Sequence, residues 1–242
     1  MNMSARIGFI KTSVIEVLQE GVAAVDCMQD SGLDDFPIMQ YVLQSLFLKM
    51  TGFGEQKLRF IIWEIASYDL EFRYKLLKGD CSFGEFSQLS DKKNVYTKLL
   101  REISALGVVD ILTDDAKNNI LQEVKTEMNT TFENASIKDA FPDDYERFLT
   151  FLNSWNKDSF AKGNELLKDN LVPIYSEYIY KQRNSCAHNT LSYQQDFLTF
   201  EDMQKPYMVY ANHFTSFAVL LLLDKVFVHL FSSFERLVEL NS

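Results

Sequence analysis

Residues 217–231 read FAVLLLLDKVFVHLF and form the most apolar stretch of the chain. Asp224, Lys225 and His229 interrupt this stretch, so no run of about 20 apolar residues, the length that spans a bilayer, can be drawn through it. In a soluble protein, a helix that is apolar on nearly all sides is buried or lies in a contact between subunits. The stretch therefore predicts a buried helix and argues against a membrane-spanning segment.

Outward from this stretch, apolar residues recur at helical spacing in nearly every part of the chain. Hydrophobic residues make up 47% of the 242 residues, which is enough for a packed core, and glycine (9) and proline (4) are too scarce for a turn-rich β architecture. Strand-like alternation is absent, although residues 107–112 (GVVDIL) could form a short strand or begin a helix. We predict an all-α fold.

The helix boundaries follow from caps and breakers. Pro37 begins a helix that should end at the glycine pair in residues 51–57 (TGFGEQK), where a connection between helices is favoured over a nucleotide-binding loop because the Gly-Lys-Ser/Thr ending is missing. Later helices are expected over 145–155, 159–170 and 173–187, and a long final helix from Pro206 to residue 239. Residues 133–144 form an acidic loop and a possible boundary, but one domain over 1–242 is the simpler interpretation.

The net charge of −10 is unevenly distributed. Only residues 41–105 are net positive, with 10 basic and 8 acidic side chains. Because the chain as a whole should repel nucleic acid, indiscriminate phosphate binding is not expected. Any RNA would have to be held locally or presented by a partner.

Other features of the sequence indicate a cytoplasmic protein without a cofactor. The first 21 residues lack a continuous apolar core and read as an amphipathic helix, not as a signal peptide. Three widely spaced cysteines give no disulfide framework, and no Cys or His cluster has the spacing of a zinc site. Paired acids before helices are interpreted as caps, and His213 and His229 as packed or surface residues.

One short motif carries a chemical signal. Residues 183–189 read RNSCAHN, with Arg183, Asn184 and His188 in an Arg-Asn-x3-His pattern. From the numbers of these residue types in the chain, about 0.005 such matches are expected by chance. The three tyrosines that precede the motif, at 175, 178 and 180, could stack bases, but their helical spacing favours packing.

On a regular helix, the motif residues point in different directions. At about 100° per residue, one stripe should face the protein's own core; its members are Tyr178, Ile179, Gln182 and Cys186. Arg183 lies on the rim of that stripe, whereas Asn184 and His188 share the opposite side, which must meet water or a second subunit. A twofold axis beside the motif would bring Arg183 and His188 of two copies together, so we predict a homodimer.

The Arg-Asn-x3-His pattern near the end of a late helix, in an all-α chain, resembles the HEPN superfamily of small helical domains. Arg183, Asn184 and His188 match the signature of that family, and Ala187 is the small residue often found before its histidine. The chain is longer than a minimal HEPN unit, so it resembles the elaborated members associated with phage defence and abortive infection. The implied fold is a HEPN-like helical bundle with extra helices.

The resemblance implies a metal-independent endoribonuclease. In such a reaction His188 would serve as base or acid, Arg183 would stabilise the phosphorane, and Asn184 would orient His188 or the phosphate. The 2′-hydroxyl of RNA supplies the nucleophile, so the products would carry a 2′,3′-cyclic phosphate and a 5′-hydroxyl.

A second interpretation is a non-catalytic HEPN-like module that binds RNA or docks a partner protein through its apolar final helix. In that interpretation Arg183 pairs with a carboxylate, and His188 is a helix C-terminal residue that the dipole favours. A regulatory or antitoxin partner is compatible with both interpretations.

Overall fold

The structure is a computed structural model that describes residues 3–28, 36–79, 83–188 and 204–241. The predicted all-α fold is confirmed, since a two-stranded antiparallel sheet is the only β structure in these ranges. The elements in chain order are α1 (Met3–Lys11), α2 (Ile15–Met28), α3 (Phe36–Tyr68), α4 (Leu70–Lys78), α5 (Leu89–Ala105), α6 (Asp114–Phe132), α7 (Ser136–Ala140), α8 (Pro142–Ser154), β1 (Phe160–Lys162), β2 (Glu165–Leu167), α9 (Leu171–Pro173), the π-helix η2 (Ile174–Ile179), α10 (Tyr180–His188), the 3-10 helix η3 (Pro206–Tyr210) and α12 (His213–Asn241).

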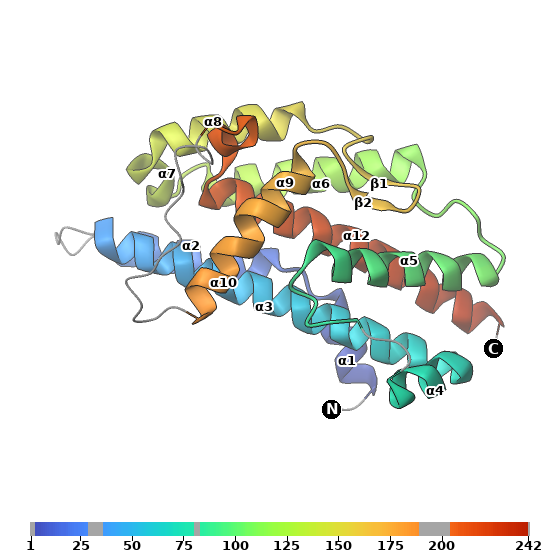
Figure 1. Ribbon diagram of the computed structural model, residues 1–242. Helices are drawn as coiled ribbons and strands as arrows, with labels where there is room; N and C mark the ends of the chain where they lie inside the picture. The colour runs from blue at the N-terminus through green and yellow to red at the C-terminus, as the bar shows by residue number, and fades with distance from the viewer. Residues whose placement is uncertain (1–2, 29–35, 80–82, 189–203, 242) are drawn as a thin grey trace.

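Helix α12, which contains the apolar stretch, lies at the centre of the fold (Figure 1). It contacts α1, α3, α5, α6 and α8, and the leucines at 220–223 are all buried. Each large apolar side chain removed from water contributes about 1.5–3 kcal/mol, so this run stabilises the packing of the helices around it. Among the described residues α12 alone is long and apolar enough to cross a bilayer, but 83% of its most apolar window is buried in the protein, which is consistent with a soluble protein.

The charge that interrupts the apolar stretch joins three elements. The Asp224 carboxylate accepts hydrogen bonds from the Lys57 Nζ of α3 (2.5 Å) and from the Val14 backbone N–H (3.0 Å), and Lys57 also donates to the Thr12 carbonyl (2.7 Å). Thr12 and Val14 lie at the break between α1 and α2. The side chains of Lys57 and Asp224 are 1% and 3% exposed. Their ion pair provides hydrogen-bond partners for the Val14 N–H and the Thr12 carbonyl, which the break leaves without helical partners.

The expected break at residues 51–57 is wrong, because α3 continues through them. Each glycine inside a helix costs about 1 kcal/mol relative to alanine. Met50 and Leu58 are buried on either side of the glycines, so the stripe that packs against the core is continuous and offsets that cost. Gly52 and Gly54 have room for a Cβ, so close packing does not require them.

The helix expected over 159–170 is also wrong, because this segment contains a β-hairpin. Lys162 pairs with Glu165, so the turn has two residues, the first of which is Gly163 with a φ of 60°. A two-residue turn that begins with glycine is typical of a hairpin. The Tyr96 hydroxyl of α5 donates to the Gly163 carbonyl (3.0 Å) and holds the turn against the helical core.

Two boundaries near the ends of helices differ from the expectations. Pro206 begins a short 3-10 helix, and α12 begins later, where the Asn212 side chain accepts a hydrogen bond from the Thr215 N–H (2.9 Å). Residues 107–112 form neither a strand nor a helix. Gly107 follows α5 with a φ of 93°, a left-handed conformation that favours glycine and ends the helix.

The acidic segment 133–144 contains α7 and the start of α8 and is not a simple loop. Asp26 of α2 accepts hydrogen bonds from the N–H and the hydroxyl of Ser136 (2.8 and 2.5 Å). Helices on both sides of the segment, α6 and α8, pack against α12. These contacts join both sides to the same core, and a single domain over 1–242 remains our interpretation.

Candidate active site

The motif helix α10 follows directly from the π-helix η2. Tyr175 and Ile179 of η2 are buried, and the Tyr175 hydroxyl donates to the Ser87 carbonyl just before α5 (2.9 Å). Packing, and not base stacking, is therefore the role of Tyr175. A π-helix advances less than 100° per residue, so the phase of a regular helix cannot be carried through it into the motif.

The predicted core stripe is only partly present. Ile179 is fully buried, whereas Tyr178, Gln182 and Cys186 are half-buried. Burial raises the pKa of the Cys186 thiol, which disfavours a reactive thiolate at this position.

Arg183 is held by a carboxylate of α3. Its Nε and Nη2 donate to the two oxygens of Glu55 at 3.1 and 3.0 Å, a bidentate ion pair, and its Nη1 donates to the Asn184 Oδ1 at 3.1 Å. The two ion-pair side chains are 18% and 12% exposed, so the guanidinium is fixed in a largely desolvated position. The structure thus brings Arg183 and Asn184 together, not onto separate sides of the helix.

The guanidinium still has capacity for a substrate. A guanidinium carries five N–H donors, and the contacts with Glu55 and Asn184 use three of them. The remaining N–H groups of Nη1 and Nη2 have no acceptor among the described residues. Arg183 can therefore offer a fixed fork of donors to a phosphate without releasing Glu55.

His188 is the last residue of α10. Its side chain lies outside the described part of the structure, so the distance from its imidazole to Arg183 is not defined. The helix places the two residues five positions apart, close to one and a half turns.

A buried lysine lies beside the ion pair. Lys92 of α5 is 4% exposed, and its Nζ donates to the Phe86 carbonyl (2.7 Å) and lies 5.6 Å from the centre of the Tyr175 ring. Burial lowers the pKa of Lys92 to about 8, against the opposing attraction of the Glu55 charge. The pair and Lys92 form one electrostatic cluster at the junction of α3, α5 and α10.

Sequence reasoning missed Glu55 and Lys92. Glu55 lies in the segment interpreted as a connection, and Lys92 is one of two adjacent lysines in an amphipathic helix. Helical phase alone gives a signal for Lys92, because it falls three positions before Val95 and seven before Leu99, on the buried stripe of α5. No comparable signal marks Glu55.

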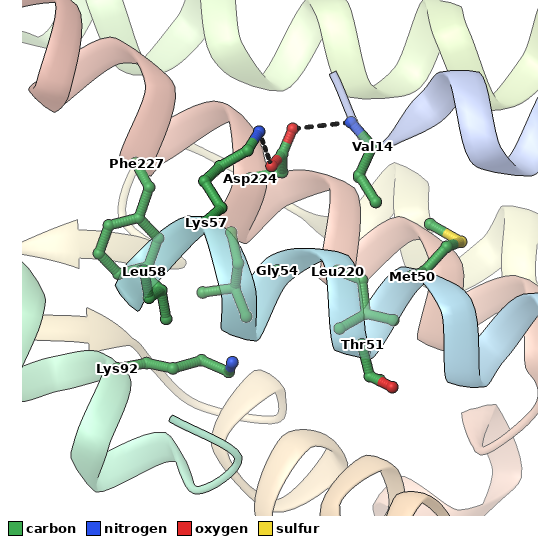
Figure 2. A pocket seen from close by; sticks show the side chains of 11 residues that line it. Val14, Met50, Thr51, Gly54, Lys57, Leu58, Lys92, Leu220, Asp224 and Phe227 are labelled. Carbon is green, nitrogen blue, oxygen red and sulfur yellow. Dashed lines mark hydrogen bonds and ion pairs between the residues drawn. The ribbon is translucent and has the colours of Figure 1, made fainter. Parts of the chain in front are cut away.

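A small cavity lies next to this cluster and is lined by Lys57, Asp224 and Lys92 together with apolar side chains (Figure 2). Its volume is about 20 Å³, enough for about one water molecule. A nucleotide cannot enter it.

The two other histidines, His213 and His229, lie against groups of the protein itself. Burial lowers the pKa of His213 to about 4, and its ring packs 6.1 Å from that of Phe217. The His229 Nε2 lies 3.3 Å from the Ile111 carbonyl. Within the described ranges no group of three His, Cys, Asp or Glu side chains could hold a metal ion.

In comparison with known proteins, no family model, no curated protein and no solved structure matches this chain. The fold and the site define an all-α protein with an ordered Arg-Asn pair in a late helix. Its assignment to the HEPN superfamily rests on the motif and remains a proposal.

Proposed function

We propose that this protein is a metal-independent endoribonuclease of a defence or toxin-type system, acting in the cytoplasm. The observation that carries the proposal is the Arg-Asn-x3-His motif in α10, with Arg183 held by Glu55 and Asn184 and with donors to spare. A fixed cation that needs no reorganisation during the reaction is the arrangement that stabilises developing charge best.

In the proposed reaction the 2′-oxygen of a ribose attacks the adjacent phosphorus while its proton passes to a base. The bond from phosphorus to the 5′-oxygen breaks, and an acid protonates the leaving oxygen. His188 supplies the base or the acid, and Arg183 stabilises the negative charge on the non-bridging oxygens. Asn184 accepts a hydrogen bond from Arg183 through its Oδ1, so in this proposal it orients the guanidinium.

We propose a homodimer with the motif at the twofold axis, since one copy of His188 serves as base and a second as acid most simply across such an axis. Ser185 and Ala187 of α10 are exposed within one chain, so this part of the helix is available for the contact.

A second candidate function is the non-catalytic module that binds RNA or a partner protein. The neutralisation of Arg183 by Glu55 and the net charge of −10 favour it. A cleavage assay separates the two candidates, because a binding module leaves RNA intact at any enzyme concentration.

The test is cleavage of total RNA in buffer containing EDTA. We expect the parent to cut RNA and leave DNA of the same sequence intact, and we expect His188→Ala and Arg183→Ala each to lower the rate about 100-fold or more. His229→Ala is the matched control, because it removes an imidazole of the same chain from α12, and it should cut like the parent. Equal cleavage by His188→Ala and by the parent would remove this function.

A further inference from the structure

A second feature of the structure lies outside the candidate active site. An open groove of about 610 Å³ runs between α4 and α5. Its basic side chains are Lys75, Lys93, Lys98 and Arg101. With only Asp69 and Glu71 as acidic lining residues, the groove is net positive in a protein whose net charge is −10. This local reversal of charge lies within the only net positive segment of the sequence.

The cations of the groove are not equivalent. Lys98 donates to Asp69 and Glu102 (3.0 and 2.5 Å), so acids of the protein neutralise it. Lys93 and Arg101 are exposed, and no ion pair holds either of them among the described residues. Eight residues of helix separate them, a rise of about 12 Å, which matches about three to four stacked nucleotides at 3.4 Å each.

Aromatic rings line the groove between these charges. Phe72 of α4 and Phe83 meet edge to face with their centroids 5.8 Å apart, and Phe83 is half-buried. The Lys98 Nζ lies 3.9 Å from the centre of the Phe72 ring, so part of this aromatic surface also supports a cation. Phe72 itself is buried, so the half-buried Phe83 is the ring that a base can reach. A groove that combines the exposed cations Lys93 and Arg101 for phosphates with an accessible ring for a base has the chemistry of a single-strand binding site.

The groove and the motif helix share α5. At the start of α5 the Gln88 Nε2 donates to the Tyr180 hydroxyl of α10 (3.2 Å), and buried Lys92 lies next to Arg183. Lys93 follows Lys92 directly in the sequence. Helix α5 runs away from α10 (Figure 1), so Arg101, eight residues later in α5, is farther from the motif helix than Lys93. A strand held along this helix would lead toward Arg183.

We propose that the groove between α4 and α5 binds the backbone of single-stranded RNA and guides it to the motif, with Lys93 and Arg101 as phosphate contacts. The assignment of the bound strand as substrate rests on the proposed function, whereas the binding itself does not. The net negative charge of the remaining protein limits binding to this groove.

The test measures binding separately from cleavage. In a His188→Ala background, fluorescence anisotropy follows a labelled single-stranded RNA of 20 nucleotides at 50 and 200 mM salt. We expect Lys93→Glu/Arg101→Glu to weaken binding at least tenfold and to reduce the slope of log affinity against log salt by about 1.4, since each single-strand phosphate contact contributes about 0.7. Both positions are exposed, so unfolding of this variant is not expected, and circular dichroism checks it.

The matched control is Arg147→Glu/Lys162→Glu, which changes the net charge equally at exposed positions of α8 and β1. It should retain the affinity and the salt slope of its parent. Three results would each overturn the proposal that the groove binds RNA. They are equal losses of affinity in the two double variants, no loss of affinity in the groove variant, and no binding of RNA by the parent. Equally tight binding of duplex DNA would overturn the assignment to a single strand.

The cleavage assay then separates the two proposals. If RNA is cut and kcat/KM is unaffected by Lys93→Glu/Arg101→Glu, the proposal that the groove binds RNA is wrong, whereas the proposed endoribonuclease activity is supported. If the parent binds RNA through the groove but cuts none, the proposed endoribonuclease activity is wrong, whereas RNA binding by the groove is supported.

Discussion

The ion pair between Arg183 and Glu55 gives the most direct test of how the motif is held. The perturbation is a double-mutant cycle with Glu55→Gln, which keeps the shape of the side chain and removes its charge, and Arg183→Met, which keeps much of the apolar stem. Each single change leaves the other charge in a largely desolvated position without its partner. The double variant removes both charges of the pair.

The expected magnitude follows from burial and geometry. Exposed pairs contribute up to about 1 kcal/mol, and breaking a buried pair costs about 3–5 kcal/mol. The Arg183 and Glu55 side chains are 18% and 12% exposed and share two hydrogen bonds, which places the pair between these limits. We expect each single variant to lose about 2 kcal/mol of unfolding free energy, and the double variant to lose about 1.5 kcal/mol less than the sum.

Urea denaturation of the four proteins measures this coupling. A matched cycle on Lys162 and Asp158, whose side chains are 55% and 57% exposed, should give no measurable coupling. A coupling between Arg183 and Glu55 no larger than that of this exposed pair would refute the view that Glu55 fixes the guanidinium.

Three further predictions concern the core and the assembly. Asp224→Asn should cost about 3–5 kcal/mol in urea denaturation because it leaves Lys57 charged and buried, whereas the double variant with Lys57→Met should lose less than Asp224→Asn alone. The folded pKa of Lys92 is about 8, below the 10.5 of an unfolded lysine, so between these values the unfolded chain binds the additional proton and stability rises with pH. The parent should therefore gain up to about 3 kcal/mol of unfolding free energy relative to Lys92→Met from pH 8 to 10.5. If the unfolding free energies of the two proteins, measured in urea, change equally with pH over this range, the lowered pKa of Lys92 is contradicted. Light scattering at micromolar concentration should give a dimer, and a monomer would count against the twofold site.

The sequence predicts the helical core well because burial and helical periodicity agree there. The stretch around Leu220–Leu223 is buried as expected. The prediction fails at glycines, because the side chains that pack around a glycine decide whether it lies within a helix or in a turn. Gly52 and Gly54 lie within a helix because the flanking apolar stripe is continuous. Gly163 lies in a hairpin turn, and its carbonyl accepts a hydrogen bond from Tyr96 of α5, a helix that is distant in the sequence.

The candidate site is predictable only in part, for a related reason. The motif in α10 is visible in the sequence, and pairing of Arg183 with a carboxylate is one of the two interpretations that the sequence allows. The identity of that carboxylate, Glu55, depends on how α3 and α10 pack, which no local pattern encodes. Which face of α10 meets the core also depends on the π-helix before the motif, because its rotation per residue differs from that of an α-helix.

The net acidic charge and an RNA substrate are compatible if binding is local. Lys93 and Arg101 are exposed side chains of one helix, α5, and the acids that outnumber the basic residues lie mainly on other segments. Such a distribution excludes RNA from most of the surface and admits it along one path.

The central claim is that His188 and Arg183 promote attack of the 2′-hydroxyl of RNA without a metal ion. Mass spectrometry of the ends produced from one defined RNA, cut in the presence of EDTA, tests it most directly. We expect 2′,3′-cyclic phosphate and 5′-hydroxyl ends from the parent, and uncut RNA with His188→Ala under the same conditions. Ends that carry a 5′-phosphate, cleavage that requires a divalent ion, or the same products from His188→Ala would contradict it.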